Sequence, residues 1–587
     1  MFGYHGTCLR IDASLARAEH VPLTEAILRQ FIGGGGLGVR LLLNEESARL
    51  DPLAPEAPIV FAFSPLVGSP LTTSAKFAVV SKSPLTQRIN DSLVSSGFAI
   101  AGKGCGCDAI IVVGRAPELS VLVIDGDYGD QDSIRLESAE EYRGASCQET
   151  EMALKARLGA NYRIASIGVG GENRVRYATI SHDGRHAGRG GSGAVLGAKN
   201  IKAIAIRGHR RTDWAHPQEL TELSKALSRR SFGPATAKYR ELGTAANLLT
   251  FNRFGALPTR NFQSGTFADA ANISPEELSA TRSKTRKSCM ACTIGCEHIY
   301  GSSTGGVRVE YESLFAMGSL CGVGDAETVL HASQRCDELG IDTISAGGTI
   351  AFAMECVERG WLDEPWLRFG SRDALLRAID LIGSRSGLGD LLAEGSRRAA
   401  TAIGHDSISI APQVKGLEIP GYEPRALQTM ALGFAVGARG ADHNRSGAYE
   451  VDFSDKVDRR RVTLDAVRLA IETEDKAALM DSLILCKFLR GVLTDFYSEA
   501  ADILRNVTGW DVSSDELHEA ARRIVSAKRD FNVLAGWTLA EDTLPERFLN
   551  TPLPDDPRAS LSPERLHALV AEYHRQRGWD AAPQPAG

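Results

Sequence analysis

The clearest chemical signal in this sequence is a set of three cysteines with the spacing Cys-x2-Cys-x3-Cys, formed by Cys289, Cys292 and Cys296. Three thiols within eight residues can surround one metal centre if the backbone turns tightly, and a glycine directly before the third makes that turn easier. The spacing fits an iron–sulfur cluster, a zinc site completed by His298, or no metal at all. A four-iron cluster needs a fourth thiolate, for which Cys486 is a candidate, although a buried apolar thiol is the simpler alternative there.

Two other stretches carry groups that could transfer protons. Residues 308–312 (Arg-Val-Glu-Tyr-Glu) place two carboxylates and a phenol close in sequence to the cysteines. Residues 439–445 (Arg-Gly-Ala-Asp-His-Asn-Arg) put a histidine among polar groups. Either stretch could supply general acid or base catalysis, and the alternative for each is a solvated or otherwise satisfied side chain.

Two glycine-rich segments could bind an anion. Residues 33–38 (GGGGLG) and 187–193 (AGRGGSG) each offer consecutive backbone N–H groups, and Arg189 adds a planar guanidinium suited to phosphate. Neither segment fits the phosphate-binding pattern Gly-x4-Gly-Lys-Ser/Thr. Each is equally compatible with a structural turn.

Composition limits the classes of protein to which the chain can belong. Its 587 residues include 66 basic and 73 acidic side chains, a net charge of −7, which argues against nucleic acid as the main partner. We see neither a signal peptide nor a run of apolar residues long enough to span a membrane, so we expect a cytoplasmic protein without a membrane partner. In that compartment its 11 cysteines are more often metal ligands, catalytic groups or core residues than disulfides.

The elements that must position these groups change in type along the chain. Short runs rich in Val, Ile and Phe predict strands in the first third, and helical periodicity dominates after a polar, basic stretch near residues 208–217. A second shift in composition falls near residues 408–413. The expected strands are residues 59–64, 77–81, 109–113, 121–124 and 203–206, and the expected helices are residues 326–339, 373–382, 388–403, 476–489 and 515–527.

Taken together and in this order, these segments resemble the aldehyde:ferredoxin oxidoreductase family, the tungsten- or molybdenum-pterin enzymes that carry one four-iron cluster. The resemblance runs over nearly the whole chain, and its specificity comes from the shared order of motifs. Those motifs are residues 33–38, 76–85, 171–173, 187–203, 257–262, 289–296, 337–342, 414–420 and 439–443.

The resemblance implies an α+β fold in which an N-terminal domain of two β-sheets cradles the pterin cofactor and two mainly α-helical domains follow. We place the β-rich pterin-binding domain at residues 1–208. The helical domain with the cysteine loop would then span residues 209–410, and a C-terminal helical domain with the fourth cluster cysteine would span residues 411–587.

The resemblance also implies a set of binding residues. The cluster ligands would be Cys289, Cys292, Cys296 and Cys486. The cofactor-binding residues would be Lys76, Ala187, Gly188, Arg189, Asp337, Gly340, Asp342, Arg445, Asp481 and Lys487.

The chain departs from the family pattern at three of its positions. Lys76 stands where the family usually has arginine, and Ile484 stands where it has glycine. Leu93 replaces part of a glycine-rich stretch that carries an asparagine, a contact for which Asn90 is a substitute.

Catalysis in the family uses a glutamate and a histidine, which correspond to Glu312 and His443. We expect Glu312 to activate water or take the proton derived from the aldehyde, His443 to polarise the carbonyl or a metal-oxo group, and Tyr311 to donate a hydrogen bond. Cys321 is a further candidate as a direct metal ligand, as a cysteine is in related benzoyl-coenzyme A reductase subunits. A buried core thiol is the alternative for Cys321.

The function implied is oxidation of aldehydes to carboxylic acids at a tungsten or molybdenum bis-pterin (molybdopterin) centre. Electrons would leave through a [4Fe-4S] cluster to ferredoxin or to a small iron–sulfur subunit. The resemblance also allows magnesium between the pterin phosphates and a homodimer. Two alternatives stay open: a relative that reduces an acid or an activated aromatic substrate with partner subunits, and a pterin-free iron–sulfur protein for electron transfer or scaffolding.

Overall fold

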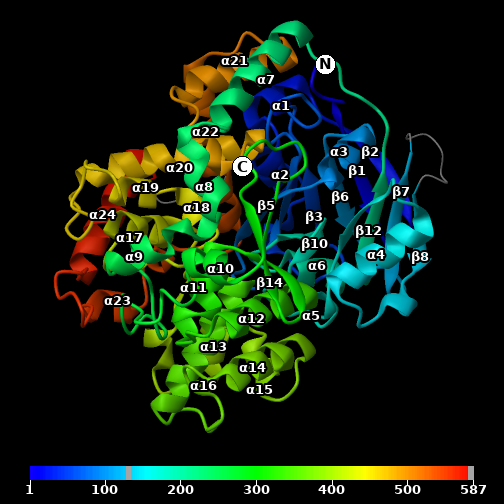
Figure 1. The fold of residues 1–587 in the computed structure, drawn as a ribbon. Coiled ribbons are helices and arrows are strands. Elements are labelled where there is room, and N and C mark those ends of the chain that lie inside the picture. The colour runs from blue at the N-terminus through cyan, green and yellow to red at the C-terminus, as the bar shows by residue number, and fades with distance from the viewer. Residues whose placement is uncertain (127–133, 580–587) are drawn as a thin grey trace.

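The computed structural model describes residues 1–126 and 134–579. Within these ranges the first third of the chain forms two six-stranded sheets (Figure 1). The first has the strand order β2-β1-β6-β3-β4-β5 and the second β11-β10-β9-β12-β7-β8. The strands of the first sheet are β1 (Thr7–Asp12), β2 (Arg17–Pro22), β3 (Ile59–Ala62), β4 (Lys76–Lys82), β5 (Ile89–Ser95) and β6 (Ala109–Val113). Those of the second are β7 (Ser120–Asp125), β8 (Ile134–Ser138), β9 (Arg163–Ser166), β10 (Ile180–His182), β11 (Arg185–Ala187) and β12 (Ile201–Arg207).

The two sheets pack face to face because their strands are apolar on the facing sides. Phe61 and Phe77 from the first sheet share one buried cluster with Leu122 and Ile204 from the second. The outer face of the first sheet is covered by α2 (Gly34–Asn44) and that of the second by α4 (Cys147–Leu158). Figure 1 shows the resulting layers, with α4 on the outside of the second sheet.

The rest of the chain is mainly helical and packs on this β-structure. One large buried cluster joins α11 (Tyr311–Met317), α12 (Ala326–Leu339) and α13 (Thr343–Glu358) to the later helices. Two further helices, α20 (Asp465–Leu483) and α22 (Ser514–Leu534), pack against α2 and so attach to the first sheet.

A small three-stranded sheet interrupts the helical part. It consists of β13 (Lys284–Lys287), β14 (Glu297–Ser302) and β15 (Gly305–Val309) in the order β13-β14-β15. The cysteine loop, residues 289–296, connects β13 to β14. This sheet therefore holds the loop at both of its ends, and the sequence had not predicted it.

The predicted fold class, an α+β chain with two N-terminal sheets followed by helices, is confirmed. All five expected strands are present, and the helix expected at residues 326–339 has the predicted limits. The helix expected at residues 388–403 is instead divided into α15 (Leu388–Leu392) and α16 (Ser396–Ile403), since Gly395 between them has φ +87°. The three domain boundaries stay predictions.

The helix expected at residues 476–489 was wrong in its limits. The helix observed, α20, begins at Asp465 and ends at Leu483, where Ile484 adopts a left-handed conformation with φ +59°. The chain therefore leaves the helix before Cys486. Among the described helices, none combines the length and apolarity needed to cross a bilayer.

Candidate functional site

A cavity of about 440 Å³ lies between the N-terminal sheets and the helical part. Its volume is within the range usual for cofactor and substrate sites. Segments from nearly the whole chain line it, which explains why its motifs are scattered through the sequence. All the predicted site residues except Ala187 and Gly340 line the cavity: Lys76, Gly188, Arg189, Cys289, Cys292, Cys296, Tyr311, Glu312, Asp337, Asp342, His443, Arg445, Asp481, Cys486 and Lys487.

The four predicted cluster cysteines meet at one end of this cavity. Cys292 donates a hydrogen bond to Cys289, and this contact is the main reason that the pKa of Cys289 falls to about 5. Cys486 is close enough to raise the pKa of Cys296, after the larger effect of burial. Because Cys486 follows the end of α20, its side chain reaches the loop from a different part of the chain.

Zinc is the less suitable of the two metals considered for these thiols. A zinc site holds each thiolate about 2.3 Å from one ion, but within the described ranges no three His, Cys, Asp or Glu side chains are grouped to hold a single metal ion. His298, the expected fourth zinc ligand, is buried in β14 with its Nε2 3.0 Å from the Arg240 carbonyl oxygen. It does not line the cavity. With His298 elsewhere, the four thiols that line the cavity are the donors that a four-iron cluster requires.

Lys76 lies next to these thiols. Burial lowers the pKa of its ammonium group, but the negative potential of Cys486, Cys289 and Cys292 outweighs burial and raises it above the ordinary value. The cation that the family pattern places here as arginine is therefore kept. Leu93 also lines the cavity, whereas Asn90 turns away and donates from Nδ2 to Ser192 Oγ at 3.0 Å.

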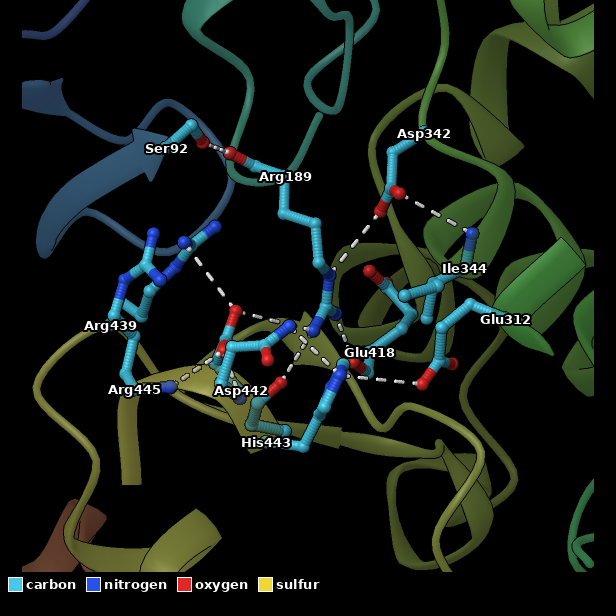
Figure 2. Close-up of polar contacts among 12 residues, drawn as sticks. Ser92, Arg189, Glu312, Asp342, Ile344, Glu418, Arg439, Asp442, His443 and Arg445 are labelled. Carbon is cyan, nitrogen blue, oxygen red and sulfur yellow. Dashed lines mark hydrogen bonds and ion pairs between the residues drawn. The ribbon is translucent and has the colours of Figure 1, made fainter. Parts of the chain in front are cut away.

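Arg189 occupies the centre of the site (Figure 2). Its guanidinium lies 3.5 Å from Asp342 and 3.8 Å from Asp442, and it donates to the backbone oxygens of Ala441 and Glu418. Asp342 is itself held as the N-cap of α13, where it accepts hydrogen bonds from the first backbone N–H groups of the helix. Arg189, which follows strand β11, is therefore held by segments that come more than 150 residues later in the chain.

Two further arginines, Arg439 and Arg445, point into the cavity from the other side and are held by Asp91. Arg445 donates from Nε to Asp91 Oδ1 at 3.0 Å, and Lys528 donates from Nζ to Oδ2 at 2.8 Å. Arg439 and Arg445 also donate to the Asp91 backbone oxygen. Burial raises the pKa of Asp91, but Arg445, Lys528 and Arg439 together hold it far below the usual range.

Asp481 and Lys487 form an ion pair in the lining of the cavity. Lys487 Nζ lies 2.7 Å from Asp481 Oδ1, and Arg445 Nη1 lies 3.3 Å from Oδ2. Burial is the main reason that the pKa of Lys487 drops to about 7. Asp481 lies in the last turn of α20, and the left-handed turn at Ile484 brings Cys486 and Lys487 back beside it.

Glu312 and His443 form the candidate catalytic pair. Glu312 Oε1 lies 3.7 Å from His443 Nε2, and Figure 2 shows the two side chains facing each other below Arg189. Burial raises the pKa of Glu312 to about 8 and lowers that of His443 to about 3. At neutral pH the imidazole is therefore uncharged, and the carboxyl group can either bind or release a proton.

The hydrogen bonds of this pair leave two polar atoms free. Asn444 Nδ2 lies 2.9 Å from His443 Nε2 and donates to it, which places the ring proton on Nδ1. Among the described residues, His443 Nδ1 and Glu312 Oε1 are buried without a hydrogen-bond partner. Gly421 N–H donates to Glu312 Oε2 at 3.0 Å, so only one carboxyl oxygen is available for chemistry.

Tyr311, expected as a hydrogen-bond donor, donates to the protein backbone. Its hydroxyl donates to the Gly421 carbonyl oxygen, so it is not free to bind a substrate. The same residue, Gly421, supplies the N–H that holds Glu312. Tyr311 therefore positions the loop that orients the glutamate.

Three of the expected residues and one expected segment lie outside the cavity lining. Ala187 is fully buried beside the lining residues Gly188 and Arg189. Gly340 ends α12 with φ +67°, and a Cβ there would lie 2.9 Å from Gly168 N, so its role is to let the chain turn between Asp337 and Asp342. Cys321 is buried away from the cavity, with its thiol donating to the backbone oxygens of Ala316 and Gly347.

The segment outside the lining is residues 33–38. A Cβ on Gly34 would lie 2.3 Å from the Asp481 carbonyl oxygen, and one on Gly38 would lie 2.4 Å from Val80 Cγ2. These glycines let α2 approach the end of α20 and strand β4 closely. They support the site from behind its lining.

Several lining residues were not predicted as site residues. Arg439 and Asp442 lie in the quoted motif around His443, and Arg308 and Glu310 lie in the motif around Glu312, so their sequence neighbourhood was the available signal. Tyr422 had no such signal, although it stacks on His443 with ring centroids 4.8 Å apart.

The lining fits an anionic pterin cofactor and an iron–sulfur cluster. Arg439 is buried and lines the cavity, and within the described part of the chain its Nε and Nη2 atoms lack any hydrogen-bond partner. Buried donors of this kind are normally satisfied, so they indicate a ligand with acceptor oxygens, such as a phosphate. Gly188 presents open space, since the nearest atom to a Cβ there would be 3.9 Å away. The four thiols supply the donor set that an iron–sulfur cluster requires.

Comparison with known proteins identifies the family of the chain. The family model "Aldehyde ferredoxin oxidoreductase, N-terminal domain" matches residues 8–208, and the model for "domains 2 & 3" of the same family matches residues 222–586. The tungsten-containing aldehyde ferredoxin oxidoreductase of Pyrococcus horikoshii is 36% identical over 600 residues, covering 99% of this chain and 97% of the relative. That of Pyrococcus furiosus is 36% identical over 596 residues with the same coverage.

A solved structure shows the same fold at lower sequence identity. The active-site complex BamBC of benzoyl coenzyme A reductase, bound to 1,5 dienoyl-CoA, superposes with a TM-score of 0.84 at 22% identity. The match covers 99% of this chain and 95% of that chain. With both family models matched over almost the whole length, the chain belongs to the aldehyde ferredoxin oxidoreductase family, a family of oxidoreductase enzymes.

Proposed function

We propose that this protein oxidises aldehydes to carboxylic acids in the cavity described above, using a tungsten or molybdenum bis-pterin centre. The reaction converts one aldehyde and one water into a carboxylic acid, two electrons and two protons. When bound, the metal–pterin centre supplies the two-electron acceptor and a [4Fe-4S] cluster supplies the one-electron relay. The observation that carries the proposal is that four thiols, five arginines and the Glu312–His443 pair line one cavity.

Glu312 is the group that handles the proton. Its pKa of about 8 is close to working pH, which is favourable for a general base. Its free Oε1 atom can accept a proton from water, while the Gly421 N–H holds the other oxygen in place. Burial keeps bulk water from competing for that oxygen.

His443 is the group that polarises the aldehyde. Because its pKa is about 3, the ring is neutral and donates one hydrogen bond from Nδ1. That donor can bind the aldehyde oxygen and stabilise negative charge that develops there. Tyr422, stacked on the ring, fixes its orientation.

The cofactors would be held by two groups of residues that line the cavity. Cys289, Cys292, Cys296 and Cys486 would hold the cluster. Arg189, Arg439 and Arg445 would bind the pterins and their phosphates, with Lys76 between the cluster and the pterin. A magnesium ion between the pterin phosphates, ferredoxin or a small iron–sulfur subunit as electron acceptor, a homodimer and a cytoplasmic location complete the proposal.

Elemental analysis combined with a dye assay tests this function. The purified protein is analysed for tungsten, molybdenum and iron, and then mixed anaerobically with benzyl viologen and a series of aliphatic and aromatic aldehydes. We expect one tungsten or molybdenum and about four irons per chain, together with aldehyde-dependent dye reduction. Full metal content without dye reduction would indicate the reductive alternative, and iron without tungsten or molybdenum would indicate the pterin-free alternative.

A further inference from the structure

The cysteine loop lies in an unusually basic part of an acidic protein. The chain carries a net charge of −7, but residues 278–296 contain four basic side chains and no acidic one. Three of these basic side chains belong to β13: Lys284, Arg286 and Lys287. All four residues of that strand are exposed.

Strand β13 is the outer strand of its sheet and is directly joined to the thiols. It pairs with β14 on one side only in the described structure, and Cys289 follows two residues after its end. Among the described residues, neither Arg286 nor Lys287 forms an ion pair with an acidic group. Lys284 is held more firmly, since its Nζ donates to the Glu241 carbonyl oxygen and to Ser279 Oγ.

Neighbouring segments extend this positive surface. The bond from Lys284 to Glu241 ties β13 to α8 (Ala237–Leu242), which carries the exposed Lys238. On the other side, Thr293 of the cysteine loop lies 2.6 Å from Ser231, where α7 (Pro217–Ser231) ends beside the exposed Arg229. We call the set Arg229, Lys238, Lys284, Arg286 and Lys287 the basic rim.

Two large apolar side chains are exposed within this rim. Met290, between the first two cluster cysteines, is 43% exposed, and Phe232, directly after α7, is 53% exposed. Exposed apolar groups surrounded by like charges are typical of a docking surface for an oppositely charged protein. The thiols beneath them are only partly buried, so a partner seated here would lie close to the cluster.

The geometry points to the basic rim as the docking surface for an acidic ferredoxin, which receives the electrons through the cysteine loop. This inference rests on the proposed function, because it needs the cluster to be present. The rim supplies long-range attraction and orientation, while Met290 and Phe232 supply the short-range apolar contact. Electron transfer is one electron at a time from the reduced cluster to the oxidised cluster of the ferredoxin, so no other reactant is required.

Charge reversal on the rim tests the inference by binding and by activity. The variants are Lys287→Glu, the double variant Arg286→Glu/Lys287→Glu, and the control Arg17→Glu, which reverses an exposed cation on β2, the outer strand of the first sheet. Binding of an oxidised bacterial ferredoxin of acidic pI to the holoenzyme is measured by surface plasmon resonance between 20 mM and 500 mM salt. Aldehyde oxidation is measured with the same ferredoxin and, separately, with benzyl viologen.

We expect the double variant to weaken ferredoxin binding by about tenfold or more at low salt, with a smaller loss at high salt, where charges are screened over a few ångströms. The ferredoxin-linked rate should fall in parallel at limiting ferredoxin, while the viologen rate and iron content stay at the wild-type level. The Arg17→Glu control should bind like wild type. Equal affinities for wild type and double variant in an enzyme active with viologen would overturn the docking surface, whereas loss of viologen activity in the wild type would instead contradict the proposed function.

Discussion

Replacing Asp91 by asparagine should loosen the arginine wall of the cavity without changing its shape. Asp91 is 2% exposed and does not line the cavity, but it binds Arg445 and Lys528 through its two carboxylate oxygens and Arg439 through its backbone. Asparagine keeps the size of the side chain and removes its charge. Three buried cations then lose their shared counter-charge.

The magnitude follows from the burial of this network. Removing one partner of a buried ion pair costs about 3–5 kcal/mol, because the remaining charge is left desolvated and uncompensated. Exposed pairs, by comparison, contribute at most about 1 kcal/mol. We therefore expect Asp91→Asn to lower the free energy of unfolding of the cofactor-free protein by about 3–5 kcal/mol.

The pH dependence gives the sign of this effect. The pKa of Asp91 is depressed in the folded protein, so its charge stabilises the fold above its unfolded pKa of about 3.9. The difference in stability between wild type and Asp91→Asn should be constant from neutral pH to about pH 5 and should shrink as pH falls further, towards the folded pKa.

Urea denaturation followed by tryptophan fluorescence measures the stability, and tungsten and pterin content of the purified protein measure cofactor binding. The variant should hold less tungsten, because Arg439 and Arg445 are no longer fixed. In the single variant Lys528→Met, Asp91 keeps its contacts with Arg439 and Arg445. The double variant Asp91→Asn/Lys528→Met should lose less stability than the sum of the two single losses, because the two residues share one interaction. A wild-type unfolding free energy together with full tungsten content in Asp91→Asn would refute this reasoning.

Three further predictions follow from the site. Glu312→Gln should reduce turnover by about 10²–10⁴ with metal content unchanged, and should abolish a rise in wild-type rate with pH centred near 8, where the carboxyl group ionises; a near-normal rate would contradict the assignment. Cys486→Ser should lower the iron content, whereas the matched control Cys321→Ser should keep it, and the reverse outcome would exchange their roles. Ile484→Gly relieves about 1–2 kcal/mol of left-handed strain but removes a side chain whose burial is worth about 2–5 kcal/mol. Urea denaturation should therefore show a net loss of up to about 4 kcal/mol, and a gain in stability would show that strain dominates.

Much of the local structure could be predicted from short segments of sequence. The strand at residues 109–113 is wholly apolar, and the helix at residues 326–339 begins at an Asp cap and ends at a glycine, so period and capping determined both. The end of a helix was predicted wrongly where a single residue broke the helical pattern, as at Ile484. A β-branched residue is not expected in the left-handed conformation that ends the helix there.

The sequence by itself determined which kinds of groups are present: three closely spaced thiols, the Glu312 and His443 motifs, and the order of segments that identifies the family. Only the tertiary structure decided how they act, because burial and partners come from distant segments. It joined Cys486 to the other thiols, gave Glu312 a pKa of about 8, and used the hydroxyl of Tyr311 for Gly421. It also showed that positions 33 and 34 need glycine because the backbones of residues 63–64 and 481 lie against them, a requirement that no local pattern records.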